Sequence, residues 1–122
     1  MSSEPRSYLL ERFQSDAVAL RQRADMLRGR GGVGDDRLPG PDAATSERMA
    51  DACEDVVAML EAIPDGSDPS AVLSSIVALS PLLDQRAQRE SATPAVRAVY
   101  AGAATRIREV QQADAAARNM LS

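Results

Sequence analysis

The chain has 122 residues, enough for one domain, and its formal net charge of −4 disfavours sequence-independent binding to nucleic acid or to anionic lipid. Hydrophobic residues make up 44% of the chain, which disfavours disorder, and no stretch has the length and hydrophobicity of a membrane-spanning helix. Aromatic residues make up only 2%, and alanine supplies much of the apolar content, so we expect a thin helical core in a single domain over residues 1–122.

Two helices are predicted in the first half of the chain. Residues 4–28 and 42–63 each place apolar side chains at alternating spacings of three and four, which is typical of helices that pack side by side. Asp42 is a favourable N-cap for the second of these helices. Between them, residues 29–41 are rich in glycine, proline and charge, and this composition predicts a flexible loop.

Two more helices are predicted in the second half. Asp68 followed by Pro69 is a typical helix start, and Thr93 followed by Pro94 begins a helix that continues to about residue 118. Pro81 lies inside the third helical pattern, where it removes a backbone donor and predicts a kink or two short helices. Additional leucine and valine residues widen the apolar face of this third helix, so we expect it to be the most buried.

The four patterns together predict an all-α fold. We expect a four-helix antiparallel bundle with up-down-up-down topology, in which the third helix is kinked or broken at Pro81. The connections after the second and third helices are short, which makes neighbouring helices antiparallel, and strand patterns are absent from the sequence. A shorter helical unit that completes its core as a homodimer is the alternative.

The chain contains no histidine and no lysine. Without histidine it lacks the usual ligand of haem and iron in helical bundles and the commonest general base, so we expect no enzymatic activity, no cofactor and no metal ion. The single cysteine, Cys53, falls among apolar residues and is expected to be buried and unreactive. A GC-rich genome explains the missing lysines more simply than avoidance of lysine-directed modification.

Four arginines, Arg21, Arg23, Arg28 and Arg30, crowd the end of the first predicted helix. Their aliphatic stems can cover the edge of the core while the guanidinium groups stay in water, and positive charge suits a helix C-terminus. The functional alternative is a binding site for an acidic partner or a phosphate group. We favour the structural interpretation and keep the four residues as candidates for partner binding.

Acidic side chains dominate the second predicted helix. Glu47, Asp51, Glu54 and Asp55 are expected on its outer face, where like charges four residues apart weaken a helix slightly. A solvated face is the simpler interpretation. A stripe that binds a basic partner is the functional one, so these four residues are also candidates for partner binding.

Asp114 falls at an apolar position of the last predicted helix, where an unpaired carboxylate would be costly. Arg86 falls at an equivalent position of the third helix. Antiparallel packing of the two helices could bring these residues together as a buried ion pair. Fraying of the helix end into water is the alternative.

These observations favour a non-enzymatic protein–protein interaction module, such as an adaptor, a regulator or a secretion-associated chaperone, from a bacterium with a GC-rich genome. The alternatives are a lysine-free effector delivered into another cell, and a helical bundle that binds or converts a small molecule through arginine and carboxylate groups. The expected partner is another protein or a second copy of the chain. The sequence starts without the pattern of a signal peptide, so we expect a cytoplasmic location, with secretion by another route as the alternative.

Overall fold

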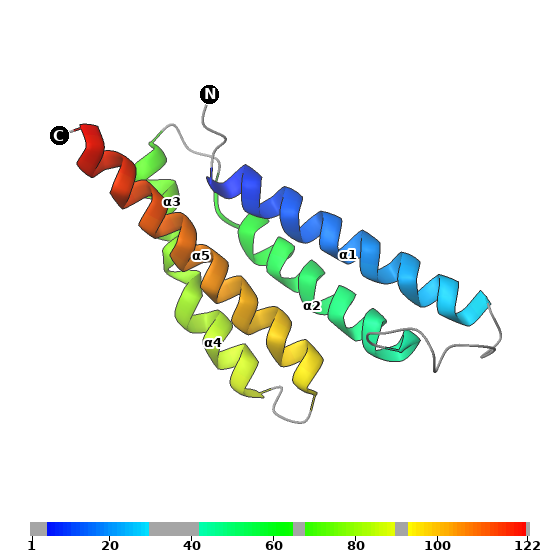
Figure 1. Cartoon of the computed structure of the whole chain (residues 1–122). Helices are drawn as coiled ribbons and strands as arrows, with labels where there is room; N and C mark the ends of the chain where they lie inside the picture. The colour runs from blue at the N-terminus through cyan, green and yellow to red at the C-terminus, as the bar shows by residue number, and fades with distance from the viewer. Residues whose placement is uncertain (1–4, 30–41, 65–67, 90–92, 122) are drawn as a thin grey trace.

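Five helices account for nearly all of the chain that the structure describes. The structure is a computed structural model, and it describes residues 5–29, 42–64, 68–89 and 93–121. The helices are α1 (Pro5–Gly29), α2 (Ala43–Glu61), α3 (Pro69–Val77), α4 (Leu79–Arg89) and α5 (Pro94–Leu121) (Figure 1). No strand occurs within the described ranges, so the prediction of an all-α fold is confirmed. The loop predicted over residues 29–41 lies, apart from Gly29, outside the described residues.

The helices form two pairs, and the pairs contact each other through α2 and α5. α1 packs along α2, α4 packs along α5, and α2 packs against α5. The first pair is antiparallel, because Arg6 near the start of α1 donates to the carbonyl of Ile63 beyond the end of α2, at 3.0 Å. Figure 1 shows the first turn of α1 and the last turn of α5 at the same end of the molecule. This packing is compatible with the predicted up-down-up-down order.

Local sequence explains where the helices begin. The Asp42 carboxylate accepts a hydrogen bond from the backbone N–H of Thr45 at 2.8 Å, as an N-cap does. The Asp68 carboxylate accepts in the same way from the N–H of Ser70 at 3.0 Å, with Pro69 in the first turn of α3. Both predicted caps are therefore confirmed.

The break in the third predicted helix lies just before Pro81. α3 ends at Val77, α4 begins at Leu79, and Ala78 lies between them. Pro81 thereby falls in the first turn of α4, where a backbone N–H would have no partner within the helix. The missing donor thus costs little, and the predicted break is confirmed.

The core is built mainly from α2 and the helices on either side of it. Its largest fully buried side chains are those of Leu9, Ser46, Val56, Leu60, Ile76, Leu83 and Ile107. Fully buried alanines, among them Ala24, Ala50, Ala103 and Ala104, let helix backbones approach closely. The core is therefore rich in alanine, as the composition indicates.

The expectation that the third helix is the most buried is wrong. In α3 only Leu73 and Ile76 are buried, and Leu82 in α4 is 47% exposed. α2 has more buried positions because it packs against α1 on one side and α5 on the other. A wide apolar face predicts burial only where neighbouring helices are present to cover it.

The last turns of α5 are poorly covered. Ile107 is the last buried residue among positions 94–120, and no side chain over residues 108–120 is buried. Figure 1 shows this end of α5 extending beyond the first turn of α1. Part of the predicted apolar face of α5 is therefore exposed to solvent in the single chain.

Candidate functional site

The arginines of α1 and the acidic residues of α2 bind one another. Arg21 makes two hydrogen bonds to the Glu54 carboxylate, at 2.6 and 3.0 Å, and one to Asp51 at 2.7 Å. Arg28 makes two hydrogen bonds to Glu47, one of them at 2.8 Å. Five of the residues predicted as candidates for partner binding are thus brought together, but as partners of each other.

These ion pairs change the acidity of the groups that form them. The Arg21 guanidinium lowers the pKa of Glu54 and the Arg28 guanidinium lowers the pKa of Glu47, chiefly through the hydrogen bonds between them. The side chains are exposed, so each pair contributes little to stability and is screened by salt. Their main consequence is that this side of α1 and α2 presents paired charges instead of a single-sign surface.

The other two arginines of the predicted cluster have different positions. Arg30 lies outside the described residues. Arg23 lines a groove between α1 and α5, away from the ion pairs with α2. The four arginines therefore do not act as one cluster within the part of the chain that the structure describes.

Asp55 faces the interior of the bundle, which corrects the prediction that it lies on the outer face of α2. Its carboxylate accepts hydrogen bonds from the Tyr100 hydroxyl of α5, at 2.9 Å, and from Arg86 of α4. Because α5 packs against this side of α2, a position on the predicted outer flank of α2 contacts Tyr100 of α5 and Arg86 of α4. Asp55 thus links three helices.

The same arrangement shows that the predicted ion pair between Arg86 and Asp114 is not formed. Arg86 pairs with Asp55, and Asp114 pairs with Arg118 four residues later, at 2.9 Å. The antiparallel register explains this, since Arg108 of α5 lies opposite Asp84 of α4. Asp114 is further along α5 and lies opposite α3 instead of α4. Neither Arg86 nor Asp114 is fully buried.

Tyr100 is the most buried polar side chain of this network. Its pKa is raised to about 12, chiefly by burial and to a smaller extent by the Asp55 carboxylate, while Arg86 acts in the opposite direction. The hydroxyl therefore stays protonated at neutral pH and donates to Asp55. The network can fix the relative positions of α2, α4 and α5.

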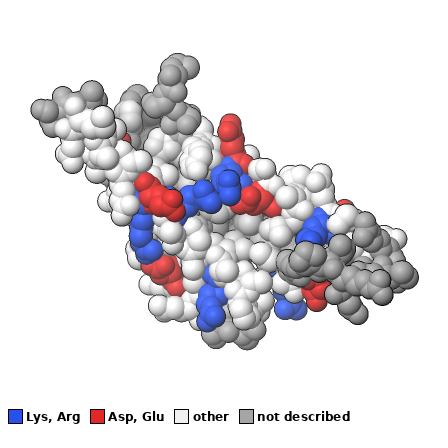
Figure 2. All heavy atoms as spheres, in the orientation of Figure 1, with Lys and Arg blue, Asp and Glu red and all other residues white. Residues whose placement is uncertain are grey.

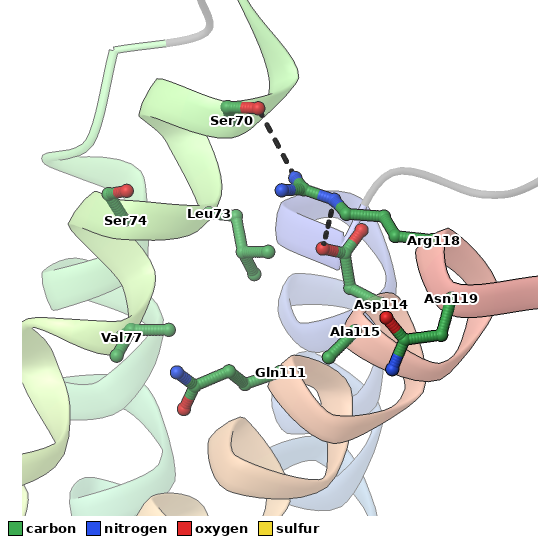
Figure 3. Close-up of a pocket in the computed structure, with 9 residues that line it drawn as sticks. All are labelled: Ser70, Leu73, Ser74, Val77, Gln111, Asp114, Ala115, Arg118 and Asn119. Carbon is green, nitrogen blue, oxygen red and sulfur yellow. Dashed lines mark hydrogen bonds and ion pairs between the residues drawn. The ribbon is translucent and has the colours of Figure 1, made fainter. Parts of the chain in front are cut away.

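A polar cavity of about 460 Å³ lies between α3 and the end of α5 (Figure 3). Arg118 extends across it from α5, donating to the Ser70 hydroxyl of α3 at 3.2 Å while pairing with Asp114. Leu73 and Gln111 also line the cavity, from opposite helices. Among the described helices, only the short α3 and the end of α5 contribute residues to the lining of this cavity.

An apolar groove of about 470 Å³ runs between α1 and α5. It forms because these two helices make little direct contact with each other, while each packs on α2. Apart from Asp16, Arg23 and Arg106, all the side chains that line it are apolar. The largest of these apolar side chains belong to Phe13, Leu20, Met49, Cys53 and Val99.

Gly102 also lines this groove, in the first half of α5. A Cβ atom placed on Gly102 would meet no atom within 4 Å, so no close approach inside the chain requires a glycine. Glycine in a helix interior destabilises the helix by about 1 kcal/mol relative to alanine. Its effect here is to leave the groove wider at its centre.

Cys53 lies at the floor of the groove and is buried, as predicted. Burial raises the pKa of its thiol to about 11, with the carboxylates of Asp16 and Glu54 as smaller causes. The thiol is thus protonated at neutral pH and is a poor nucleophile or metal ligand. The described residues contain no group of three or more side chains arranged to hold a metal ion.

The groove is not predicted by the sequence. Leu20 and Met49 follow the apolar spacing of their helices, but the structure leaves both partly exposed at the groove. The signal that could have revealed the groove is Gly102, a helix-weakening residue inside a long helical pattern. Figure 2 shows groups of adjacent arginine and acidic side chains on the face that carries α1 and α5, and the surface between these groups is uncharged.

None of the described helices combines the length and the hydrophobicity that crossing a lipid bilayer requires. Comparisons with protein families, with curated proteins and with solved structures find no match to this chain.

Proposed function

We propose that this chain is a non-enzymatic protein–protein interaction module that receives a helix of its partner in the groove between α1 and α5. The observation that carries the proposal is the groove itself, an apolar channel left open between two helices that otherwise pack well on α2. A helix laid in such a groove buries its own apolar stripe and covers the exposed parts of the lining side chains. An adaptor, a regulator and a secretion-associated chaperone all use surfaces of this kind.

Two features indicate that the residues lining the groove serve binding and not only the stability of the fold. Leu20, Met49 and Val99 are only partly buried in the single chain, so their burial is incomplete without another molecule. Gly102 weakens α5 without any internal contact that needs it. A cytoplasmic location is part of the proposal, because a reducing compartment suits a single free cysteine.

Filling the groove tests the proposal. Gly102→Leu places a large side chain where a Cβ meets no atom, so the variant should fold and the groove should be blocked. Ala58→Leu is the matched control, because Ala58 is an exposed helical residue of α2 that does not line the groove. Since the chain has no lysine, an affinity tag can be attached at the α-amino group alone.

The measurement is quantitative capture of partners from a lysate of the source organism by the wild type and the two variants, with helicity checked by circular dichroism. We expect a stoichiometric partner that the wild type and Ala58→Leu retain and that Gly102→Leu loses. Equal capture by all three folded proteins would show that the groove does not bind the partner.

A second candidate function is binding of a small polar molecule in the cavity between α3 and α5. The specific observation is that Arg118, Gln111 and Ser70 line one opening together with the apolar Leu73. A thermal-shift screen of carboxylate and phosphate metabolites tests it, with Arg118→Gln as the variant. Stabilisation of the wild type by a metabolite, lost in Arg118→Gln, is the expected result, and no stabilisation by any compound would contradict it.

A further inference from the structure

We infer that the helix received by the groove between α1 and α5 is the end of α5 from a second copy of this chain. The two α5 helices then pack antiparallel, and Arg106 of each copy pairs with Glu109 of the other. This inference rests on the proposed function and names the partner. It follows from an exposed seam along α5, from the order of charges in this seam, and from the uncovered end of the helix.

α5 carries two seams of residues at alternating spacings of three and four. The first seam is buried within the chain and includes Val96, Tyr100, Ala103 and Ile107. The second, which we call the exposed seam, lies on another side of the helix, and none of its residues is buried in the single chain. Its members are Ala95, Val99, Gly102, Arg106, Glu109, Ala113, Ala116 and Met120. This spacing is typical of two helices that pack along one another, so the exposed seam is suited to a second helix.

Most of the exposed seam consists of small or apolar residues. Gly102 and the alanines allow two helix axes to approach to about 8 Å. Met120 is 87% exposed near the end of the seam. The seam covers residues 95–120, which correspond to a rise of about 37 Å or about seven turns of helix. Small residues alone do not select a partner, but the two charged members of the seam do.

These two charged residues lie at the centre of the exposed seam and have opposite signs. Positions 106 and 109 are equally far from the midpoint of the seam, as are positions 102 and 113, 99 and 116, and 95 and 120. A second copy related by a two-fold axis at this midpoint places Arg106 opposite Glu109 twice. A parallel copy places like charges opposite each other, which weakens binding. The order of charges therefore favours an antiparallel copy of the same helix.

Both charged side chains can take part in this pairing. Arg106 donates to the neutral Tyr8 hydroxyl at 3.3 Å and forms no ion pair with the described residues. A guanidinium group has five N–H donors, so this contact leaves donors for a carboxylate. The Glu109 carboxylate is exposed and has no ion pair or hydrogen bond within the part of the chain that the structure describes. In contrast, Arg108 between them already pairs with Asp84 of α4.

The antiparallel contact covers both of the surfaces that the single chain leaves open. Val99, Gly102 and Arg106, from the first half of the exposed seam, line the groove between α1 and α5. Ala113 and Met120, from its second half, belong to the end of α5 where no described side chain is buried (Figure 1). Antiparallel pairing lays the second half of one seam on the first half of the other. The end of α5 in each copy thereby enters the groove of the other copy, with Gly102 opposite Ala113.

The oligomeric state of the purified full chain tests the inference, by sedimentation velocity over a range of protein concentrations. We expect the wild type to be a dimer. Glu109→Arg replaces both ion pairs by contacts between arginines, and Arg106→Glu replaces them by contacts between glutamates. Each variant should dimerise at least tenfold more weakly at low salt, because each ion pair contributes about threefold and repulsion adds to the loss. Circular dichroism verifies that each variant is folded.

Exchanging the two charges should restore the dimer. The double variant Arg106→Glu, Glu109→Arg keeps opposite charges at equal distances from the midpoint, so it should dimerise like the wild type. An equal mixture of the two single variants should form a heterodimer for the same reason. Arg97→Glu is the matched control and should remain a dimer, because Arg97 is an exposed arginine of α5 outside both the seam and the groove.

The outcomes separate this inference from the proposed function. A monomeric wild type would overturn the inference, and capture from the lysate by the Gly102 variants then decides the proposed function alone. A dimer that Gly102→Leu disrupts, but that neither charge reversal weakens, would overturn the antiparallel pairing while the helix-binding groove stands. A dimer that withstands Gly102→Leu and both charge reversals would overturn the inference as well, because another surface would hold the two copies together. Failure of the double variant to dimerise, with the variant folded, would contradict the pairing of Arg106 with Glu109.

Discussion

Raising the pH above 9 tests the burial of Tyr100 and Cys53. The chain has no lysine and no histidine, and arginine stays protonated, so cysteine and tyrosine are the only side chains that lose a proton between pH 9 and pH 12. The pKa of Tyr100 is raised from 10.0 to about 12 and that of Cys53 from 9.0 to about 11, in both cases mainly by burial.

Because both pKa values are raised by folding, the stability of the fold decreases at high pH. A raised pKa in the folded state means that the unfolded chain loses the proton first, so the stabilisation is complete below pH 9 and is lost as the pH rises to 12. At pH 11 the loss is roughly 1 kcal/mol for Tyr100 and roughly 2 kcal/mol for Cys53. The free energy of unfolding of a folded domain is typically about 5 to 15 kcal/mol. Together these losses are on the order of one third of it.

Urea unfolding followed by circular dichroism at pH 8, 9, 10 and 11 measures this loss. The matched controls are Tyr100→Phe, Cys53→Ala and the double variant, and Tyr8 cancels because every protein contains it. We expect the free energy of unfolding of the wild type to fall with pH and that of the double variant to change far less. Equal slopes in the two proteins would refute the burial of these groups.

Three further predictions concern α2 and α5. Gly102→Ala should raise the free energy of unfolding by about 1 kcal/mol, because the new methyl group meets no atom; a decrease in thermal denaturation would contradict this. Ser46→Ala should stabilise by about 1 kcal/mol, because the Ser46 hydroxyl is buried and has no partner among the described residues, whereas Ser75→Ala should change little in the same urea assay. Stability should fall as the pH drops below 4, because Arg28 and Arg21 lower the pKa values of Glu47 and Glu54; the double variant Glu47→Gln, Glu54→Gln should lose part of this slope.

Much of the local structure could be predicted from the sequence because its signals are local. Asp42 and Asp68 cap helices through their own nearby backbone, and Pro81 breaks a helix through its own missing donor. Phe13 and Leu60, which follow the apolar spacing of the first two predicted helices, are buried in the core. These effects act within a few residues, so no neighbouring helix is needed to predict them.

The candidate site could not be predicted in the same way. Apolar spacing indicates which face of a helix is buried, but not how far two helices slide or how closely they approach. The register of α5 against α3 and α4 separated Asp114 from Arg86, and the position of α2 between two helices turned Asp55 inward. Residues of both signs on α1 and α2 were identified from the sequence, but their pairing was not.

The sequence by itself determined the helices, their ends, the break at Pro81 and a core rich in alanine. Only the tertiary structure decided that Arg21 pairs with carboxylates of α2, and that α1 and α5 are held apart with Arg106 and Gly102 between them. The physical reason is the distance along the chain over which each effect acts. Helix formation depends on the backbone and on side chains one turn away, whereas a groove depends on how side chains from three helices fill the space between them.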